Sequence, residues 1–347
     1  MRRVDAALPF LGPAALLVAV GVIGSQTSFS LQVDFAQALV YAAIVIALYV
    51  FVGNSGVISF GHISFVALGA FITGVLTVPK ESKEFVLPGL FPVLQDHTIS
   101  NWQALALGAG VGGLYALVVG IPLMRLSGLA AGIATFAVLG ITHNVFSNWE
   151  RIGPGVQTLS LVPSTTSMTQ ATIGTLLVAL VAYAYQRTRS GRLLRASRED
   201  PLAAQASGMH IYSHRLVAFT ISGALAGFAG ALLVHLYGSL TVGQVYLELT
   251  FLTLAMLVIG GASSLLGATV GALFVSLLDS LLNRAENGTG VLGLDFDLPH
   301  GSRLVILGAL MTLVLLLRPG GITGGHELSL ARFRLARRGR LLTRSRT

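Results

Sequence analysis

The sequence contains no cysteine, and only 10% of its 347 residues are charged. The absence of cysteine excludes a disulfide framework and a thiolate metal site. So few charges cannot cover the surface of a soluble protein of this size, since 54% of the residues are hydrophobic and the mean hydropathy is +0.79. The composition therefore predicts an all-α integral membrane protein.

The chain also lacks the short motifs that are typical of enzymes and nucleotide-binding proteins. It contains no H-E-x-x-H, G-x-x-x-x-G-K-[ST] or G-x-S-x-G pattern. His62, His143 and His235 fall in predicted spans without the spacing of three or four residues that places two ligands on one helix face. We expect no catalytic residue, cofactor or metal ion, and a membrane-embedded enzyme is a disfavoured alternative.

Hydropathy divides the chain into segments of the length that a transmembrane helix needs, roughly 20 residues. The region 246–283 is too long for one span, and we expect a break at the Gly260-Gly261-Ala-Ser-Ser264 stretch. We interpret the apolar N-terminal segment as the first span, with a signal peptide as the alternative. About ten transmembrane helices are predicted, at 8–24, 36–52, 56–78, 102–124, 128–146, 170–186, 215–237, 246–263, 265–283 and 302–318.

Basic residues are distributed unevenly between the two sides of these spans. With a cytoplasmic N-terminus, only Lys80, Lys83, Arg151, Arg284 and Arg303 lie outside, so 17 of the 22 Lys and Arg residues lie inside. This asymmetry fits the positive-inside rule and predicts that both termini are cytoplasmic.

The chain is thus expected to form one polytopic transmembrane domain over 1–325 and a basic cytoplasmic tail over 326–347. The tail contributes to a net charge of +8, which anionic lipid headgroups can balance. A protein contact is the alternative for this tail, and a nucleic-acid contact is disfavoured. Glycines four residues apart, such as Gly108 and Gly112, Gly223 and Gly227, and Gly267 and Gly271, predict close helix packing.

Ionisable residues are scarce inside the spans, which disfavours an ion-coupled secondary carrier. The two acidic residues, Glu248 and Asp279, both lie near the predicted outer boundary. Asp279 shares a helical row with positions 271 and 275, so it should face packed neighbours. We expect Asp279 to be hydrated or paired with Arg284 or Arg303, with a proton relay as the alternative.

The cytoplasmic segment 187–214 contains a short predicted helix between arginine-rich flanks. Asp200 and Pro201 have the residue types of an N-cap and a first helical position, and Gly208 has that of a residue just past the C-terminus. Between them, Leu202, Ala203, Ala204 and neighbouring small residues favour helix. Such a short helix buries too little surface to be stable alone, so we expect it to dock on a partner or to lie on the bundle as an ordinary loop helix.

The segment SGVISFGHISF at 55–65 places glycine, serine and histidine next to strongly apolar runs. With its flanks, Gly53 to Ala70, it resembles the glycine- and histidine-bearing segment of LivM-type permeases of branched-chain amino-acid ABC importers. Residues 191–232, 258–272 and 317–324 resemble the cytoplasmic loop, glycine hinge and C-terminal end of the same family. Irregular backbone at membrane depth lines a cavity or is buried in protein.

That resemblance implies a multi-pass protein of the plasma or inner membrane that imports branched-chain amino acids. It implies a second homologous permease, two ABC ATPase subunits and an extracytoplasmic substrate-binding protein as partners. The helix at Asp200 to Gly208 resembles the ATPase coupling helix of this family. For Ser59, Gly61, His62 and Phe65 we expect a role in lining or hinging the translocation path, with plain close packing as the alternative.

One stretch departs from the family pattern. Where the family shows G-G-x-x-G-L-x-x-I-P, this chain has Gly153-Pro-Gly-Val-Gln-Thr-Leu-Ser-Leu-Val-Pro163, without the glycine before Leu159. The external mouth of the path therefore differs. Urea and short amides, which related permeases carry, stay open as alternative substrates.

Overall fold

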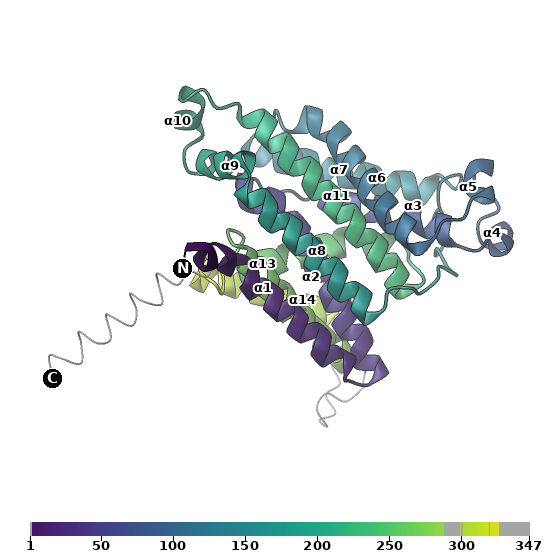
Figure 1. Ribbon diagram of the computed structural model, residues 1–347. Coiled ribbons are helices and arrows are strands. Elements are labelled where there is room, and N and C mark those ends of the chain that lie inside the picture. The colour runs from purple at the N-terminus through teal and green to yellow at the C-terminus, as the bar shows by residue number, and fades with distance from the viewer. Residues whose placement is uncertain (1, 288–298, 300, 319, 326–347) are drawn as a thin grey trace.

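The computed structural model describes residues 2–287, 299, 301–318 and 320–325, and it is almost entirely helical in this part of the chain. Figure 1 shows the helices packed side by side in a bundle. The helices are α1 (Arg2–Ser25), α2 (Phe29–Ser55), α3 (His62–Thr77), α4 (Lys80–Val86), α5 (Pro92–Asp96), α6 (Asn101–Leu123), α7 (Gly128–Asn148), α8 (Met168–Arg187), α9 (Arg189–Glu199), α10 (Pro201–Ala206), α11 (Ile211–Tyr237), the 3₁₀ helix η1 (Val242–Val245), α12 (Leu247–Gly260), α13 (Leu265–Glu286) and α14 (Ser302–Leu317).

Each predicted span corresponds to an apolar helix, which confirms the all-α membrane fold. Within the described ranges, 8 segments are long and apolar enough to cross a membrane: α1, α2, α6, α7, α8, α11, η1 with α12, and α13. The other two, α3 and α14, have 16 residues each. The chain bends by 117° between α3 and α4. The break in 246–283 is confirmed, because α12 ends at Gly260 and Ser264 caps α13 by accepting from the Gly267 amide at 2.9 Å.

The predicted span 56–78 is wrong at its N-terminal end. Residues 56–61 are not helical, and α3 begins only at His62. Gly56 has a φ of 71°, and its amide donates to the Val52 carbonyl at 2.9 Å, so it ends α2 in the left-handed conformation that glycine adopts without strain. The polar stretch is therefore a turn between two helices at one end of the bundle.

Helix α2 lies at the centre of the bundle. It is apolar on every side, and nearly all residues from Ala36 to Ser55 are buried against α8, α11, α13 and other helices. A helix that is hydrophobic all round is stable only when neighbours cover every face. Helices α1, α8, α9, α11, α12 and α13 contact α2 and supply that cover.

The predicted small-residue packing is confirmed between α6 and α11. A Cβ placed on Gly108 would lie 2.8 Å from the Gly227 carbonyl oxygen, and one on Gly112 would lie 2.5 Å from that of Gly223. Backbone atoms cannot move aside as flexible side chains do. These glycines therefore allow the two helix backbones to touch, as small residues do in membrane bundles.

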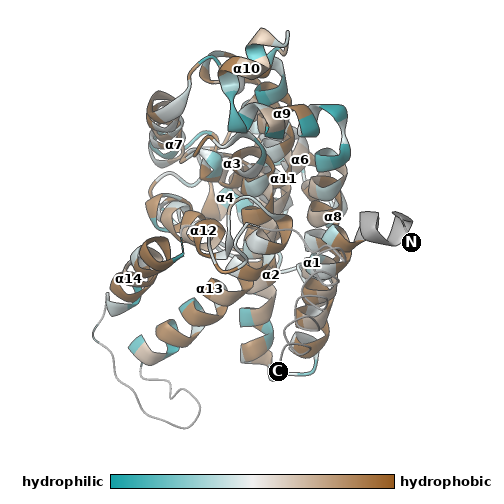
Figure 2. Cartoon of the chain, turned by 90° about the vertical axis from the view of Figure 1, so that its left-hand side faces the viewer, coloured by the Kyte–Doolittle hydropathy of each residue, from teal (hydrophilic) through white to brown (hydrophobic). Residues whose placement is uncertain are grey.

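Two groups of short helices mark the ends of the bundle. Figure 1 shows α9 and α10 at one end, and α4 and α5 far from them beyond α3 and α6. In Figure 2, hydrophilic residues gather on α9 and beside α10, whereas hydrophobic residues dominate α1, α12 and α14. The assignment of the α10 end to the cytoplasm stays a prediction, and the predicted tail at 326–347 lies outside the described residues.

Candidate functional site

The turn between α2 and α3 leads into His62, which is buried among packed helices. His62 begins α3 and is 3% exposed, Ser59 is 1% exposed and Phe65 is fully buried. The imidazole ring centre lies 5.4–5.6 Å from the ring centres of Phe51, Phe65 and Phe219. In this conformation the predicted path residues are enclosed by protein.

Two serine hydroxyls fix the orientation of the His62 ring. Ser222 Oγ of α11 donates to the Ala47 carbonyl of α2 at 2.5 Å, so it accepts from His62 Nε2 at 2.7 Å. In a neutral imidazole, Nδ1 then accepts from Ser59 Oγ at 2.8 Å. His62 thus connects α3 to α2 and α11 through one continuous hydrogen-bonded chain.

Gly61 permits the close approach of α7 to the same turn. A Cβ on Gly61 would lie 2.5 Å from the Thr135 carbonyl oxygen, and the Phe60 amide donates to Thr135 Oγ1 at 3.2 Å. The Gly61 carbonyl also accepts from the Ser64 amide at 3.0 Å, which starts α3. The segment 55–65 is therefore a junction of four helices, α2, α3, α7 and α11.

The other two span histidines also contact neighbouring protein groups. His235 Nδ1 lies 2.7 Å from the Ala231 carbonyl oxygen, and its Nε2 lies 3.0 Å from Thr77 Oγ1. His143 stacks on Tyr246 with the ring centres 3.9 Å apart. No cluster of three His, Asp or Glu side chains suited to a metal ion occurs in the described part of the chain.

The predicted capping of the short helix is confirmed in α10. Asp200 accepts from the amides of Leu202 and Ala203, both at 3.0 Å, Pro201 is the first helical residue, and Gly208 has a φ of 79° just past the end. Leu202 is 79% exposed, and Ala203 is exposed as well. Ala204 does not share this outer surface, because it is 8% exposed and packs within the chain.

Helix α9, which the sequence did not predict, holds α10 on the end of α2. Arg195 Nε donates to Asn54 Oδ1 at 2.7 Å, and Arg198 Nη1 donates to the Gly53 carbonyl at 3.0 Å. The Arg198 side chain also passes over Gly56, where a Cβ would lie 2.8 Å from its Cγ. Pro201 of α10 and Gly56 line the same cavity of about 560 Å³. The exposed helix is thus tied to the junction that contains His62.

A polar pocket of about 420 Å³ lies where α2, α11, α12, α13 and α14 meet. Asp279, which lines it, is in the C-terminal half of α13, at the opposite end of that helix from Ser264. Arg303 Nε lies 3.1 Å from Asp279 Oδ1, and Arg303 also pairs with Glu248. Of the two predicted partners of Asp279, Arg303 is confirmed. Arg284 is wrong, because it pairs with Asp34.

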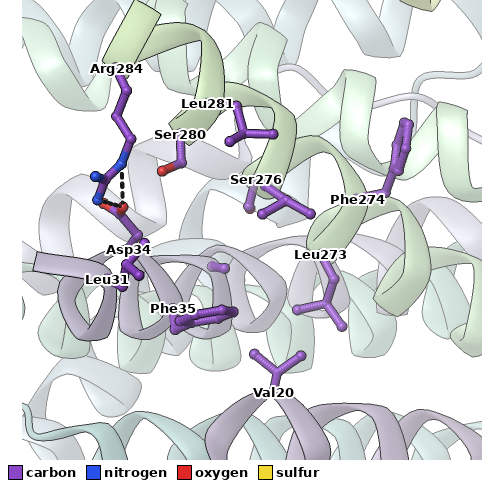
Figure 3. Close-up of a pocket in the computed structure, with 12 residues that line it drawn as sticks. Val20, Leu31, Asp34, Phe35, Leu273, Phe274, Ser276, Ser280, Leu281 and Arg284 are labelled. Atoms are coloured by element: carbon purple, nitrogen blue, oxygen red, sulfur yellow. Dashed lines mark hydrogen bonds and ion pairs between the residues drawn. The ribbon is translucent and has the colours of Figure 1, made fainter. Parts of the chain in front are cut away.

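Figure 3 shows a second pocket, between α1, α2 and α13. Its volume is about 450 Å³, and apolar side chains such as Val20, Phe35 and Leu273 form most of its wall. The side chains of Asp34 and Arg284 point toward each other at one end and form an ion pair. The wall of this pocket is therefore mainly apolar, and its two charged side chains are paired with each other.

Comparison with known proteins shows what this bundle belongs to. Residues 35–315 match the family described as branched-chain amino acid transport system / permease component. The chain belongs to this permease family. It is a multi-pass permease of ABC transporters in the cell membrane, and not itself an enzyme.

Individual relatives span most of the permease. This chain is 25% identical over 326 residues to the high-affinity branched-chain amino acid permease LivM of Salmonella typhimurium, and the alignment covers 84% of this chain and 69% of the relative. LivM of Escherichia coli K12 is 24% identical with the same coverage of both chains. The nucleoside ABC transporter permease NupC of Lactococcus lactis is 25% identical over 276 residues, covering 73% of this chain and 82% of the relative. No solved structure matches the permease.

Proposed function

We propose that this permease forms the translocation path for branched-chain amino acids in an ABC importer. The family match over residues 35–315 and the two LivM relatives support this substrate class. In this proposal the permease works with a second homologous permease, two ATPase subunits and an extracytoplasmic binding protein. The tail at 326–347 contacts anionic lipids at the cytoplasmic surface.

The observation that carries the coupling part of the proposal is the anchored, exposed α10. Leu202 and Ala203 project from a helix that is too short to be stable alone, yet Arg195 and Arg198 tie its support, α9, to the end of α2. A rigid arm with an uncovered apolar tip suits docking into a groove of an ATPase subunit. Movement of that tip would pull directly on the α2 end.

The segment 55–65 is proposed as the hinge that receives this movement. Its turn follows the α2 end, and His62 links it to α11 through Ser222. Displacement of α9 would therefore shift α2, α3 and α11 together, because their contacts are backbone-close and buried. Ser59, Gly61, His62 and Phe65 then act on the translocation path by orienting its helices.

The substitution Ala203→Glu tests the docking role of α10. It places an unpaired carboxylate in the proposed apolar contact, and a penalty of about 3 kcal/mol weakens association by roughly 100-fold. We expect normal membrane insertion but loss of the ATPase subunits on co-purification and loss of uptake. Arg189→Gln, a change at an exposed position of α9, is the matched control and should retain both. ATPase retained at the wild-type level by Ala203→Glu, with normal uptake, would rule out α10 as the contact.

A different solute is the second candidate, because the NupC relative is named for nucleosides and the mouth of the path departs from the family pattern. Urea and short amides belong to the same alternative. Uptake by the reconstituted importer separates these candidates directly. Labelled leucine, isoleucine or valine should enter the vesicles, and excess unlabelled adenosine or urea should leave their entry unchanged.

A further inference from the structure

The polar pocket contains a charged cluster that neither helix packing nor the coupling proposal requires. Its three charged side chains differ in exposure: the side chain of Glu248 is 47% exposed, that of Arg303 is 19% exposed and that of Asp279 is 6% exposed. They come from three helices, α12, α14 and α13, so the pocket forms only in the folded bundle.

Negative charge is in excess in this pocket. Arg303 is the only cation among its lining residues in the described part of the chain, and it faces both Asp279 and Glu248. Asp279 Oδ1 is buried and accepts no hydrogen bond, although it lies 3.1 Å from Arg303 Nε. The ion pair offsets the cost of burying this carboxylate, and the oxygen still has capacity to accept a hydrogen bond. The pocket therefore has room for one further positive donor.

Arg303 is held in place by its backbone as well as by its ion pairs. Its amide donates to Glu286 Oε1 at 2.5 Å, and Ser302 Oγ donates to the same oxygen at 3.2 Å. These contacts fix the start of α14 against the end of α13. The guanidinium can then exchange partners while its main chain stays in position.

The rest of the pocket wall is divided between apolar and hydroxyl groups. Val245, Leu249 and Leu252 are buried aliphatic side chains of the wall. The hydroxyl oxygens of Tyr41 and Tyr237, which also line the pocket, are hydrogen-bonded to each other at 3.1 Å. One pocket therefore offers a carboxylate, a guanidinium and an aliphatic surface, and its volume of about 420 Å³ is in the range of small-molecule sites.

We propose that this pocket is a transit site for the head group of an aliphatic amino acid, an inference that rests on the proposed function. The α-ammonium group donates to Asp279, and the α-carboxylate accepts from Arg303. The branched side chain lies on Val245, Leu249 and Leu252. A zwitterion adds one charge of each sign. When the Asp279–Arg303 pair opens, Asp279 therefore gains the ammonium group as its partner and Arg303 gains the carboxylate.

The same charges discriminate against other solutes. A nucleoside or urea carries no ammonium group for Asp279, and a carboxylic acid without an amine adds a third negative charge to those of Asp279 and Glu248. Either ligand would leave a buried charge unpaired, which costs far more than a lost neutral contact. The pocket thus favours the zwitterion over solutes that lack the amine.

The test uses the complete importer, with its ATPase subunits and binding protein, reconstituted in vesicles and supplied with labelled leucine. Asp279→Asn should lower the initial uptake rate by about 10- to 100-fold, the effect of losing one charge-assisted hydrogen bond. Asp279→Glu should restore most of the rate. Asp34→Asn is the matched control, because it breaks the other ion pair between α13 and a neighbouring helix, and it should transport normally.

A second measurement does not depend on the folding of Asp279→Asn. Asn283→Cys puts a thiol at an exposed position of the pocket in a chain without native cysteine. Liganded binding protein with leucine and ATP should slow its reaction with a small aqueous thiol reagent, and adenosine should not.

The outcomes separate this inference from the function on which it rests. Wild-type import of leucine, combined with equal rates for Asp279→Asn and Asp34→Asn or with unchanged labelling of Asn283→Cys, would overturn the head-group site and leave the proposed function standing. A wild-type importer that carries none of leucine, isoleucine and valine would overturn the proposed function itself.

Discussion

Replacement of His62 by alanine distinguishes a hinge from a path-lining residue. The change removes hydrogen bonds to Ser59 and Ser222 and empties the space between three phenylalanine rings. Two hydrogen bonds contribute about 2 kcal/mol in net terms, and a cavity at a fully packed site adds about 2 kcal/mol more. We therefore expect the free energy of unfolding to fall by about 4 kcal/mol.

The assay is unfolding of the purified permease complex in mild detergent titrated with a denaturing detergent, alongside leucine uptake in vesicles. Ser222→Ala should have a smaller effect, about 1–3 kcal/mol, because it leaves His62 Nε2 without its acceptor. The two effects should be non-additive in the double variant, since they remove one shared contact. His210→Ala, at an exposed position before α11, serves as the control and should leave stability unchanged. Normal stability of His62→Ala with abolished uptake would refute the hinge and indicate that His62 contacts the solute.

Two further predictions concern packing and the loop at 79–101. Gly227→Ala should destabilise the bundle strongly, because its Cβ would lie 2.9 Å from the Gly112 Cα. Gly110→Ala is the control: its Cβ would meet nothing within 4 Å, so this variant should be neutral or slightly stabilising. Equal melting temperatures for the two variants would contradict this prediction. Lys83→Met should speed proteolysis within 79–101, because the buried ammonium group of Lys83 donates to two backbone carbonyls of this loop at 2.6 and 2.9 Å. Lys80→Met should not, because the ion pair of Lys80 is exposed. Equal cleavage rates for the two variants would show that the Lys83 hydrogen bonds do not hold the loop.

The sequence predicts those features that depend on local chemistry. Apolar runs locate the spans, and Asp200, Pro201 and Gly208 predict α10 with its caps, because capping involves residues only a few positions apart. The glycine spacing likewise predicts that α6 and α11 pack closely on neighbours, but not that they pack on each other. Each of these signals is complete within one segment of the chain.

The features that sequence reasoning missed depend on contacts between distant segments. Helix α9 is rich in arginine and resembles a solvated loop, but Arg195 and Arg198 are satisfied by the α2 end about 140 residues earlier. The polar pocket combines Glu248 and Arg303, which are 55 residues apart, with Asp279. Gly56 was a missed local signal: a glycine after a long apolar helix is typical of a helix end, and it indicated a turn at 56–61.

Crosslinking from α10 tests the central claim, ATPase docking through this helix, most directly. The permease has no native cysteine, so Ala203→Cys introduces a single thiol on the exposed face of α10. In the assembled importer, a short thiol-reactive photocrosslinker on this residue should join the permease to an ATPase subunit. Ala204→Cys, one residue away but buried, and Val156→Cys, 82% exposed and remote from α10 in the chain, should give little product. An ATPase that co-purifies with the permease yet crosslinks no better from position 203 than from position 156 would contradict the account.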